Sequence, residues 1–487
     1  IYSNGVFDGK VTFKGDGYFG GNNVFNDSLV LTPGRNYSLA NYSTQQISAT
    51  GTLVANGNCD GYIKIQSNNP GYAAYLQVVG ANLIVDNTIL QDITAVVSTG
   101  YLAYANNKSV DIDNNTNWNF TTNTSTSLYW VGGSGNWNDP NHWSTTSGGS
   151  GGSCIPGPLD DVFFDANSFT SSSKNVAINV TEPTCRNMDW TGALYTPSFN
   201  QSIGSELKIY GSLTLISNMT LNTGTFSFES TSTGNTITTN GKILNNRVNF
   251  KGEGGEWTLQ DAFENNSMIE LYSGSLNTNN QDVKTQYFYS GSNRTRGLSL
   301  GSSNFTLKSD YWYLPNTQNL TFNAGTSTII FLTNYSNNRL YGGGMTYNNV
   351  TFNGNGSYPG DIQNNNTFNG TVTFNNTALI SGNNTFNGNV IMNSDGEIKY
   401  NNTYNGILKF TSGQSYTLPA NYTQTFGTNG SFVSVGSPCA PIAISSSING
   451  TASTLSKATG EICTDYLYLN GIKTTGGATF YYGLNRK

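Results

Sequence analysis

A five-residue motif occurs three times at equal spacing, as Asn366-Thr367-Phe368-Asn369-Gly370, Asn384-Thr385-Phe386-Asn387-Gly388 and Asn402-Thr403-Tyr404-Asn405-Gly406. Its aromatic residues are 18 positions apart (386 − 368), and Tyr422 continues the same spacing. Short alternating runs such as 371–374 lie between the motifs and indicate strands. The Asn-Gly steps indicate tight turns.

A repeat this short cannot enclose a hydrophobic core of its own, so each unit must stack on its neighbours. A coil of strands and turns without helix is typical of one rung of a parallel β-helix. We therefore predict an all-β parallel β-solenoid. Four aromatic rings are expected to stack inside it, those of Phe368, Phe386, Tyr404 and Tyr422, with asparagine amide ladders at the turns.

The composition excludes several classes of protein. The chain has 487 residues, a net charge of -6 and only 10% charged residues, so it offers no basic surface for nucleic acid. With 36% hydrophobic and 13% aromatic residues it is not expected to be disordered. No apolar run is long enough to span a membrane, so we expect no membrane insertion. No charged-then-apolar leader follows Ile1, and we expect no signal peptide within this stretch.

A second repeat is much longer. Residues 1–108 match residues 380–487 with an offset of 379, as in Phe7 with Phe386 (386 − 7). We therefore predict tandem modules of 379 residues in a larger parent protein, with neighbouring modules as partners. The predicted organisation is the end of one solenoid at 1–115, a junction and Trp-rich cap at 116–170, and the next solenoid at 171–487.

The junction is rich in tryptophan. An open solenoid end exposes a hydrophobic cross-section and unpaired strand edges, and both need a cover. Large rings with one polar edge suit this task. We predict a cap built from Trp130, Trp137, His142, Trp143 and Trp190.

The cap motif also resembles a known type of protein. Tyr-Trp-Val-Gly-Gly-Ser-Gly-Asn-Trp at 129–137, Asp-Val-Phe-Phe-Asp-Ala at 161–166 and the segment 185–192 resemble repeat modules of giant Bacteroidetes surface proteins. Those proteins include gliding-motility adhesins exported by type IX secretion. The resemblance implies an extracellular or cell-surface location and contact with polysaccharide or another substratum.

Catalysis is the competing hypothesis, because parallel β-helices include polysaccharide lyases and hydrolases. Such enzymes need clustered carboxylates, or a basic residue near an acidic metal site. Acidic residues are scattered thinly here, and the single His142 has no nucleophile motif beside it. We expect no catalytic residues and favour a stiff, repetitive adhesin fibre for attachment or gliding. The alternative is a carbohydrate-active β-helix, either a lyase or hydrolase or a polysaccharide-binding module.

Three acidic residues after the cap motif form the one candidate metal site. Asp160, Asp161 and Asp165 could supply oxygen ligands to Ca²⁺, but their spacing does not match an EF-hand loop. We favour turn capping by these side chains, and we expect no cofactor unless calcium binds there.

The 5 cysteines contain no Cys-x-x-Cys pair, so they do not indicate a zinc site. Disulfides of an oxidising compartment are the better interpretation. We predict a bridge between Cys154 and Cys185, and Cys439 with Cys463 as a second candidate pair. Cys59 matches Cys439 after a one-residue slip and is the predicted unpaired thiol.

Surface tyrosines that stack on sugars are a further hypothesis. The densest aromatic groups are Tyr311-Trp312-Tyr313 and Tyr481-Tyr482. About half of any such run points into the core of a strand, and we favour a core role.

Overall fold

The computed structural model describes residues 1–59, 61–121, 125–309, 311–332, 338–354 and 358–482. These residues form 63 short strands and one 3-10 helix, Pro140–His142. The strands wind into a parallel β-solenoid of about 21 turns, which confirms the predicted fold class. Three strands make one coil, because most strands pair with the strand three places later in the chain.

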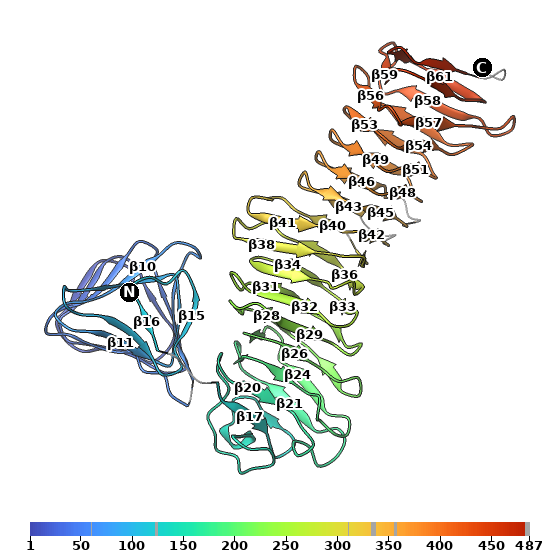
Figure 1. The fold of residues 1–487 in the computed structure, drawn as a ribbon. Coiled ribbons are helices and arrows are strands. Elements are labelled where there is room, and N and C mark those ends of the chain that lie inside the picture. The colour runs from blue at the N-terminus through green and yellow to red at the C-terminus, as the bar shows by residue number, and fades with distance from the viewer. Residues whose placement is uncertain (60, 122–124, 310, 333–337, 355–357, 483–487) are drawn as a thin grey trace. The chain divides into compact units, whose positions relative to one another are not determined.

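The chain divides into two compact units. The first comprises residues 1–242 with 251–257, and the second comprises residues 243–250 with 258–487. Figure 1 shows the strands of successive coils as layers of arrows in the green-to-red part of the chain. The predicted junction and cap segment, 116–170, lies in the first unit.

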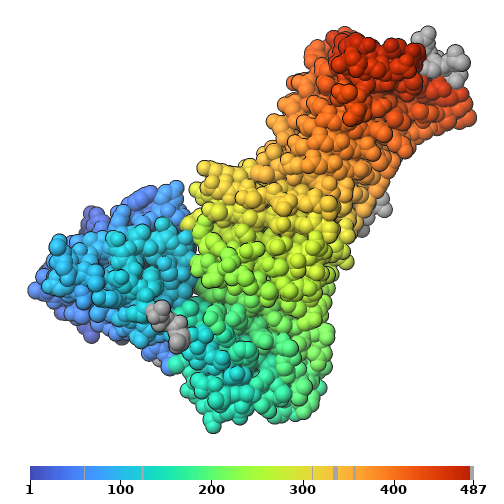
Figure 2. Space-filling model, viewed as in Figure 1, coloured from blue at the N-terminus to red at the C-terminus, as the bar shows by residue number. Residues whose placement is uncertain are grey.

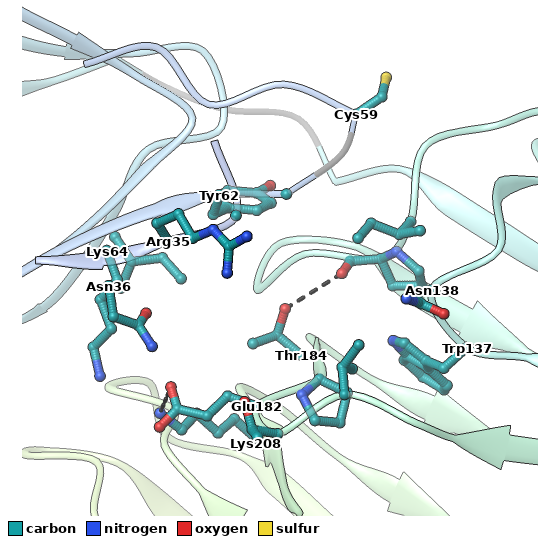
Figure 3. A pocket seen from close by; sticks show the side chains of 18 of the residues that line it. Arg35, Asn36, Cys59, Tyr62, Lys64, Trp137, Asn138, Glu182, Thr184 and Lys208 are labelled. Carbon is teal, nitrogen blue, oxygen red and sulfur yellow. Dashed lines mark hydrogen bonds and ion pairs between the residues drawn. The ribbon is translucent and has the colours of Figure 1, made fainter. Parts of the chain in front are cut away.

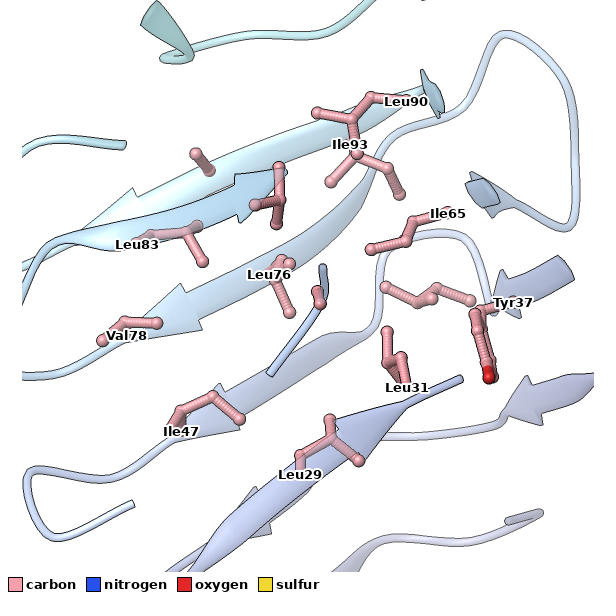
Figure 4. Packing of buried hydrophobic residues seen from close by; sticks show 14 of the residues in the cluster. Leu29, Leu31, Tyr37, Ile47, Ile65, Leu76, Val78, Leu83, Leu90 and Ile93 are labelled. Carbon is pink, nitrogen blue, oxygen red and sulfur yellow. The ribbon is translucent and has the colours of Figure 1, made fainter. Parts of the chain in front are cut away.

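The first unit begins with a coil stack that ends at residue 121. One of its sheets is formed by β1 (Gly5–Phe7), β4 (Asn23–Phe25), β7 (Thr44–Ile47), β10 (Ala74–Val78) and β13 (Ile93–Val97). Aliphatic side chains from alternate strand positions fill the space between the sheets, as Figure 4 shows for Leu29, Ile65 and Leu76. Because no coil encloses a core alone, the packing of neighbouring coils stabilises this part of the chain.

A second set of coils in the first unit starts at residue 127. One sheet of this set contains β17 (Ser127–Trp130), β20 (Asp161–Phe163), β23 (Met188–Asp189), β26 (Leu213–Thr214) and β29 (Asn235–Thr238). At its start β17 also pairs with β19 (Trp143–Ser144), and that pairing is antiparallel. A short antiparallel strand therefore covers the edge of β17 that would otherwise be open.

The second unit contains the predicted aromatic stack. Strands β47 (Thr367–Phe368), β50 (Thr385–Phe386), β53 (Asn402–Tyr404) and β56 (Thr423–Phe426) are successive neighbours in one sheet. Phe368, Phe386 and Tyr404 are fully buried, and their ring centroids lie 5.1 and 5.2 Å apart. The gradual change from yellow to red in Figure 2 follows this coil-on-coil order.

The prediction for the fourth ring is wrong. Tyr404 stacks on Phe426, at 5.6 Å, and Tyr422 is 38% exposed beside Tyr400. The coil between Tyr404 and Phe426 has 22 residues instead of 18 (426 − 404), since Tyr404 is paired with Phe426 in the sheet. The four extra residues move the ring position from Tyr422 to Phe426.

Asparagine side chains form two kinds of ladder in the same coils. Inside, the Oδ1 of Asn384 accepts a hydrogen bond from the backbone N–H of Asn366 at 3.0 Å, and Asn384 donates its own N–H to Asn402 in the same way. Outside, Asn387 donates its amide to Asn369 at 2.8 Å and accepts from Asn405 at 2.8 Å. The predicted amide ladders are therefore present, and the inner ladder satisfies backbone N–H groups at the turns.

The long repeat is reproduced strand by strand. β2 (Val11–Phe13) corresponds to β51 (Val390–Met392), and β9 (Ile63–Ser67) corresponds to β58 (Ile442–Ser446), both with the offset of 379 (390 − 11 and 442 − 63). β10 matches β59 (Ser453–Lys457) with the same offset. The two ends of the chain therefore build the same series of coils.

Candidate functional site

The tryptophans of the predicted cap pack against one another. The ring of Trp130 stacks on His142 at 4.7 Å and meets Trp143 edge-on at 5.1 Å. Trp143 in turn meets Trp137 at 5.0 Å. All three tryptophans are fully buried, and the indole N–H groups of Trp130 and Trp143 donate to backbone carbonyls. Four of the five predicted cap residues thus form one cluster.

The position of His142 explains Gly135 of the motif. A Cβ on Gly135 would lie 1.9 Å from the Nε2 of His142, so only glycine fits beneath the imidazole. The Nδ1 of His142 is 2.8 Å from the carbonyl oxygen of Val131. Its ring is held by stacking and by this backbone contact, which gives His142 a packing role in the cap.

Trp190, the fifth predicted cap residue, lies outside this cluster, further along the solenoid. It stacks on Phe164 at 3.7 Å and contacts Phe199 of the following strand, β24 (Ser198–Gln201). Trp118, which also falls within the predicted junction, packs on the core of the first coil stack and donates its indole N–H to Ile93. It therefore closes the preceding coils and takes no part in the cap cluster.

The three aspartates of the candidate calcium site do not converge. Asp160 is buried, pairs with Lys108 and accepts the N–H of Gly157 at 3.0 Å. Asp161 pairs with Arg186, whose Nε is 2.7 Å away. Among the residues that the structure describes, no group of three or more His, Cys, Asp or Glu side chains is arranged to hold a metal ion.

Asp165 has a different role again. It accepts the backbone N–H of Asn167 at 2.9 Å and contacts Ser168, so it caps a turn. Its side chain, like those of the other two aspartates, is occupied by partners of its own. The structure thus favours ion pairing and turn capping over a shared calcium site.

The predicted disulfide pairing is wrong. Cys154 is bonded to Cys59, with the two Cα atoms 4.4 Å apart, whereas Cys185 is buried and free. Cys439 and Cys463 are exposed and free. The bond joins the first coil stack to the loop that follows the cap. Sequence spacing could not show this contact, because it arises between segments 95 residues apart.

A cavity of about 620 Å³ lies beside this disulfide in the first unit (Figure 3). The first coil stack contributes Arg35, Tyr62 and Lys64 to its wall. The coils after the cap contribute Glu182 and Lys208, whose charged atoms are 2.7 Å apart. These residues were not predicted from the sequence, because they form no motif and only the fold brings them together.

The charges in this cavity affect one another. Desolvation, reinforced by the neighbouring Lys208 charge, lowers the pKa of Lys64 to about 8. Burial also opposes charge on Lys208, but the carboxylates of Glu229 and Glu182 outweigh it and raise the pKa of Lys208. Burial raises the pKa of the Tyr62 phenol, and Asp160 adds to the effect. The cavity can therefore accept an anionic group beside a lysine that gains and loses its proton near pH 8.

The second unit carries a row of tyrosines on the outer face of one sheet. β37 (Tyr287–Tyr289), β40 (Tyr311–Tyr313) and β43 (Asn338–Tyr341) are neighbouring strands, with Trp312 and other central residues buried. The flanking tyrosines lie on the opposite side and are half-buried. The favoured core role is therefore correct for Trp312 and wrong for Tyr311 and Tyr313, because strand alternation turns both outward.

These outward rings, which we call the tyrosine face, are Tyr287, Tyr289, Tyr311, Tyr313 and Tyr341. Tyr287 stacks on Tyr311 at 5.1 Å, and Tyr313 lies 5.8 Å from Tyr289 and 4.9 Å from Tyr341. The similar triplets at 287–289 and 311–313 are the sequence feature that could have identified this face.

An amide-rich groove begins at the edge of the tyrosine face. Tyr341 lines it together with Tyr400, and its volume is about 300 Å³. The other lining residues are uncharged and polar or small, namely Gln363, Asn364, Asn365, Ser381, Gly382 and Asn383. Flat aromatic rings next to amide donors and acceptors are suited to a neutral, hydroxyl-rich ligand.

Comparison with known proteins finds no matching family, no similar curated protein and no similar solved structure. Within the described parts of the chain, none of the helical structure has the length and apolar character needed to cross a membrane.

Proposed function

We propose that this chain is a segment of an extended, non-catalytic surface fibre that places adhesive contacts at a distance from the cell. The observation that most supports this proposal is the strand-by-strand repetition of the first coils by the last ones. The last coils of the chain repeat the coils that precede the Trp-rich cap. Copies of such a module can therefore follow one another in series. The resemblance of the cap motif to modules of giant gliding-motility adhesins agrees with this role.

Several features suit a structure that works outside the cell. The chain has few charged residues, so the stability of its coils depends on ladder hydrogen bonds more than on surface ion pairs. The Cys59–Cys154 disulfide is typical of an oxidising compartment. Export and anchoring at the cell surface are part of the same proposal.

Small-angle X-ray scattering of the purified chain tests the fibre. We expect the distribution of interatomic distances to have the long tail of an elongated particle. A symmetrical distribution, as given by a compact sphere, would contradict the proposal.

A second candidate function is polysaccharide binding, and the tyrosine face favours it. Ring stacking on sugars needs exposed, fixed aromatic planes, and the contacts between these tyrosines hold their rings in place. Affinity electrophoresis against a panel of neutral and acidic polysaccharides tests this function. Replacement of Tyr289, Tyr313 and Tyr341 by Ala should abolish any retardation, whereas Tyr42→Ala with Tyr72→Ala, a control pair of exposed rings 5.9 Å apart, should not.

The catalytic alternative centres on the cavity with Lys64. A depolymerisation screen on acidic polysaccharides, with and without Ca²⁺, tests it. Turnover that Lys64→Met abolishes would establish an enzyme and contradict the proposed non-catalytic role.

A further inference from the structure

We propose that Cys439 forms a disulfide with the cap-loop cysteine of the next module, the counterpart of Cys154, so that a disulfide fastens each module to the cap of the module that follows it. This inference rests on the proposed function, since it requires a second module of the same kind. The partner thiol of Cys439 is therefore the cysteine of a loop with the sequence Gly-Ser-Cys-Ile-Pro, as found at 152–156.

The first observation is the bond that already exists at the equivalent place. Cys59 lies in the first coil stack and is bonded to Cys154 in the loop after the cap. The same loop is held close to the stack by two further contacts. Lys108 pairs with Asp160, and Gly157 approaches the ring of Tyr62 so closely that a Cβ would lie 1.9 Å from it.

The second observation is that the turn containing Cys59 is built again around Cys439. Asn58 and Gly61 exchange both backbone hydrogen bonds, at 3.2 and 3.0 Å, and Ser437 and Ala440 do so at 3.1 Å each. These residues differ by 379 positions (437 − 58 and 440 − 61).

The strand beside each turn is also equivalent. Gly57 donates to the carbonyl of Asp86 at 2.9 Å, and Gly436 donates to that of Asp465 at 3.1 Å. Cys439 stands one position later in its turn than Cys59, a shift of about 3.8 Å along the chain. Both cysteines therefore lie at the tip of the same four-residue turn.

The third observation is a difference between the two copies around these turns. At the positions of Arg35, Tyr62 and Lys64, which line the cavity, the later copy has Gln414, Pro441 and Ala443. The charges and the ring of the first junction are thus absent from the second copy, whereas the turn and a cysteine are retained. The feature that both copies retain is a cysteine in the turn.

The other free cysteines do not fit this role. Cys185 is fully buried, and burial raises the pKa of its thiol, so it is not available to a neighbouring module. Cys463 is exposed, but it lies in β60 (Glu461–Cys463), and the first copy has Ile84 at its position. Cys463 therefore has no equivalent residue in the first copy that forms a disulfide.

The bond requires an oxidant. The thiol of Cys439 and that of the cap-loop cysteine each lose one proton and one electron as the two Sγ atoms join. A small-molecule disulfide such as oxidised glutathione accepts the two electrons and two protons and becomes two thiols.

The test uses the chain extended in its own register. Lys487 corresponds to Lys108 (487 − 108 = 379), so residues 1–487 followed by a second copy of residues 109–487 reproduce one further junction. The second copy carries Cys439→Ser, because no module follows it, so the remaining Cys439 belongs to the first copy. The protein is refolded in a reduced and oxidised glutathione buffer, alkylated and digested without reduction, and its linked peptides are identified by mass spectrometry. We expect Cys439 of the first copy linked to Cys154 of the second, alongside the Cys59–Cys154 link.

Two variants sharpen the result. Cys439→Ser in the first copy should leave Cys154 of the second copy as an alkylatable thiol, and Cys463→Ser should leave the link unchanged. Alkylation of the first copy's Cys439 in the tandem chain, or a link from the second Cys154 to Cys463, would overturn the inference. Scattering from the same Cys439→Ser sample distinguishes the two failures, because an elongated particle without the link leaves the proposed fibre intact.

Discussion

The rings of Phe368 and Phe386 lie face to face, with centroids 5.1 Å apart and planes inclined by 10°. They come from equivalent positions of successive coils, so each ring covers the next. Phe386→Ala should remove the middle of the stack and destabilise the chain by about 3–5 kcal/mol. Hydrogen exchange of β47, β50 and β53 measures this effect locally, which suits a repetitive protein.

Tyr422→Ala is the matched control for the stack. Its ring lies on the surface, so exchange in the same strands should change little. Equal loss of protection in the two variants would contradict the stacking of Phe368, Phe386 and Tyr404.

A second prediction concerns the inner asparagine ladder. Asn384 is buried, and Asn384→Ala leaves the N–H of Asn366 without its acceptor. The expected destabilisation is about 1–3 kcal/mol, the usual effect of an unsatisfied buried group. Asn387→Ala in the exposed outer ladder should have a smaller effect, and thermal unfolding followed by circular dichroism compares the two. An equal decrease in both variants would show that burial of the ladder is unimportant.

A third prediction follows from the cysteines. Without reductant, a chromogenic thiol reagent should react rapidly with Cys439 and Cys463 and not with Cys185, whose buried thiol has a raised pKa. Unfolding in guanidinium should expose one additional thiol. Three rapid reactions in the folded chain, or five thiols after unfolding, would contradict the described disulfide and the burial of Cys185.

A fourth prediction concerns the pH dependence of stability. Lys64 has a pKa of about 8 in the folded chain and 10.5 as its ordinary value. Between these values the unfolded chain binds the proton and the folded chain does not, so stability should rise with pH from 8 toward 10.5. Below pH 8 the folded chain carries the full penalty of the buried charge, at most about 3 kcal/mol.

Lys64→Met removes this charge and keeps most of the volume. The variant should be more stable than the original at pH 7, and the difference should shrink as pH rises to 9.5. Urea unfolding at several pH values measures it, and a difference that stays constant with pH would show that Lys64 is not the titrating group.

The sequence predicted the stacking of Phe368, Phe386 and Tyr404 because their coils have equal length and a fixed period determines the register. It failed at Tyr422, where four added residues shift the register without changing the kind of residue. Side chains alternate between the two faces of a strand. Because Trp312 points inward, Tyr311 and Tyr313 must point outward and form part of the tyrosine face.

The disulfide and the cavity could not be predicted in this way. Cys59 meets Cys154, and Lys64 lies near Lys208, only because of how one coil stack contacts the loop after the cap. Neither spacing nor composition encodes that contact. The same applies to Asp160, whose partner Lys108 belongs to the preceding coils.

The most direct measurement is the length added by one module. Electron cryomicroscopy of the 487-residue chain and of the tandem chain, residues 1–487 continued by 109–487, gives the contour length of each. If successive modules are arranged in series along a fibre, 379 additional residues should lengthen the particle by on the order of 80 Å, given about 21 coils in 487 residues and about 4.8 Å per coil. An unchanged length, or two compact bodies without coil-on-coil density, would contradict the proposed fibre.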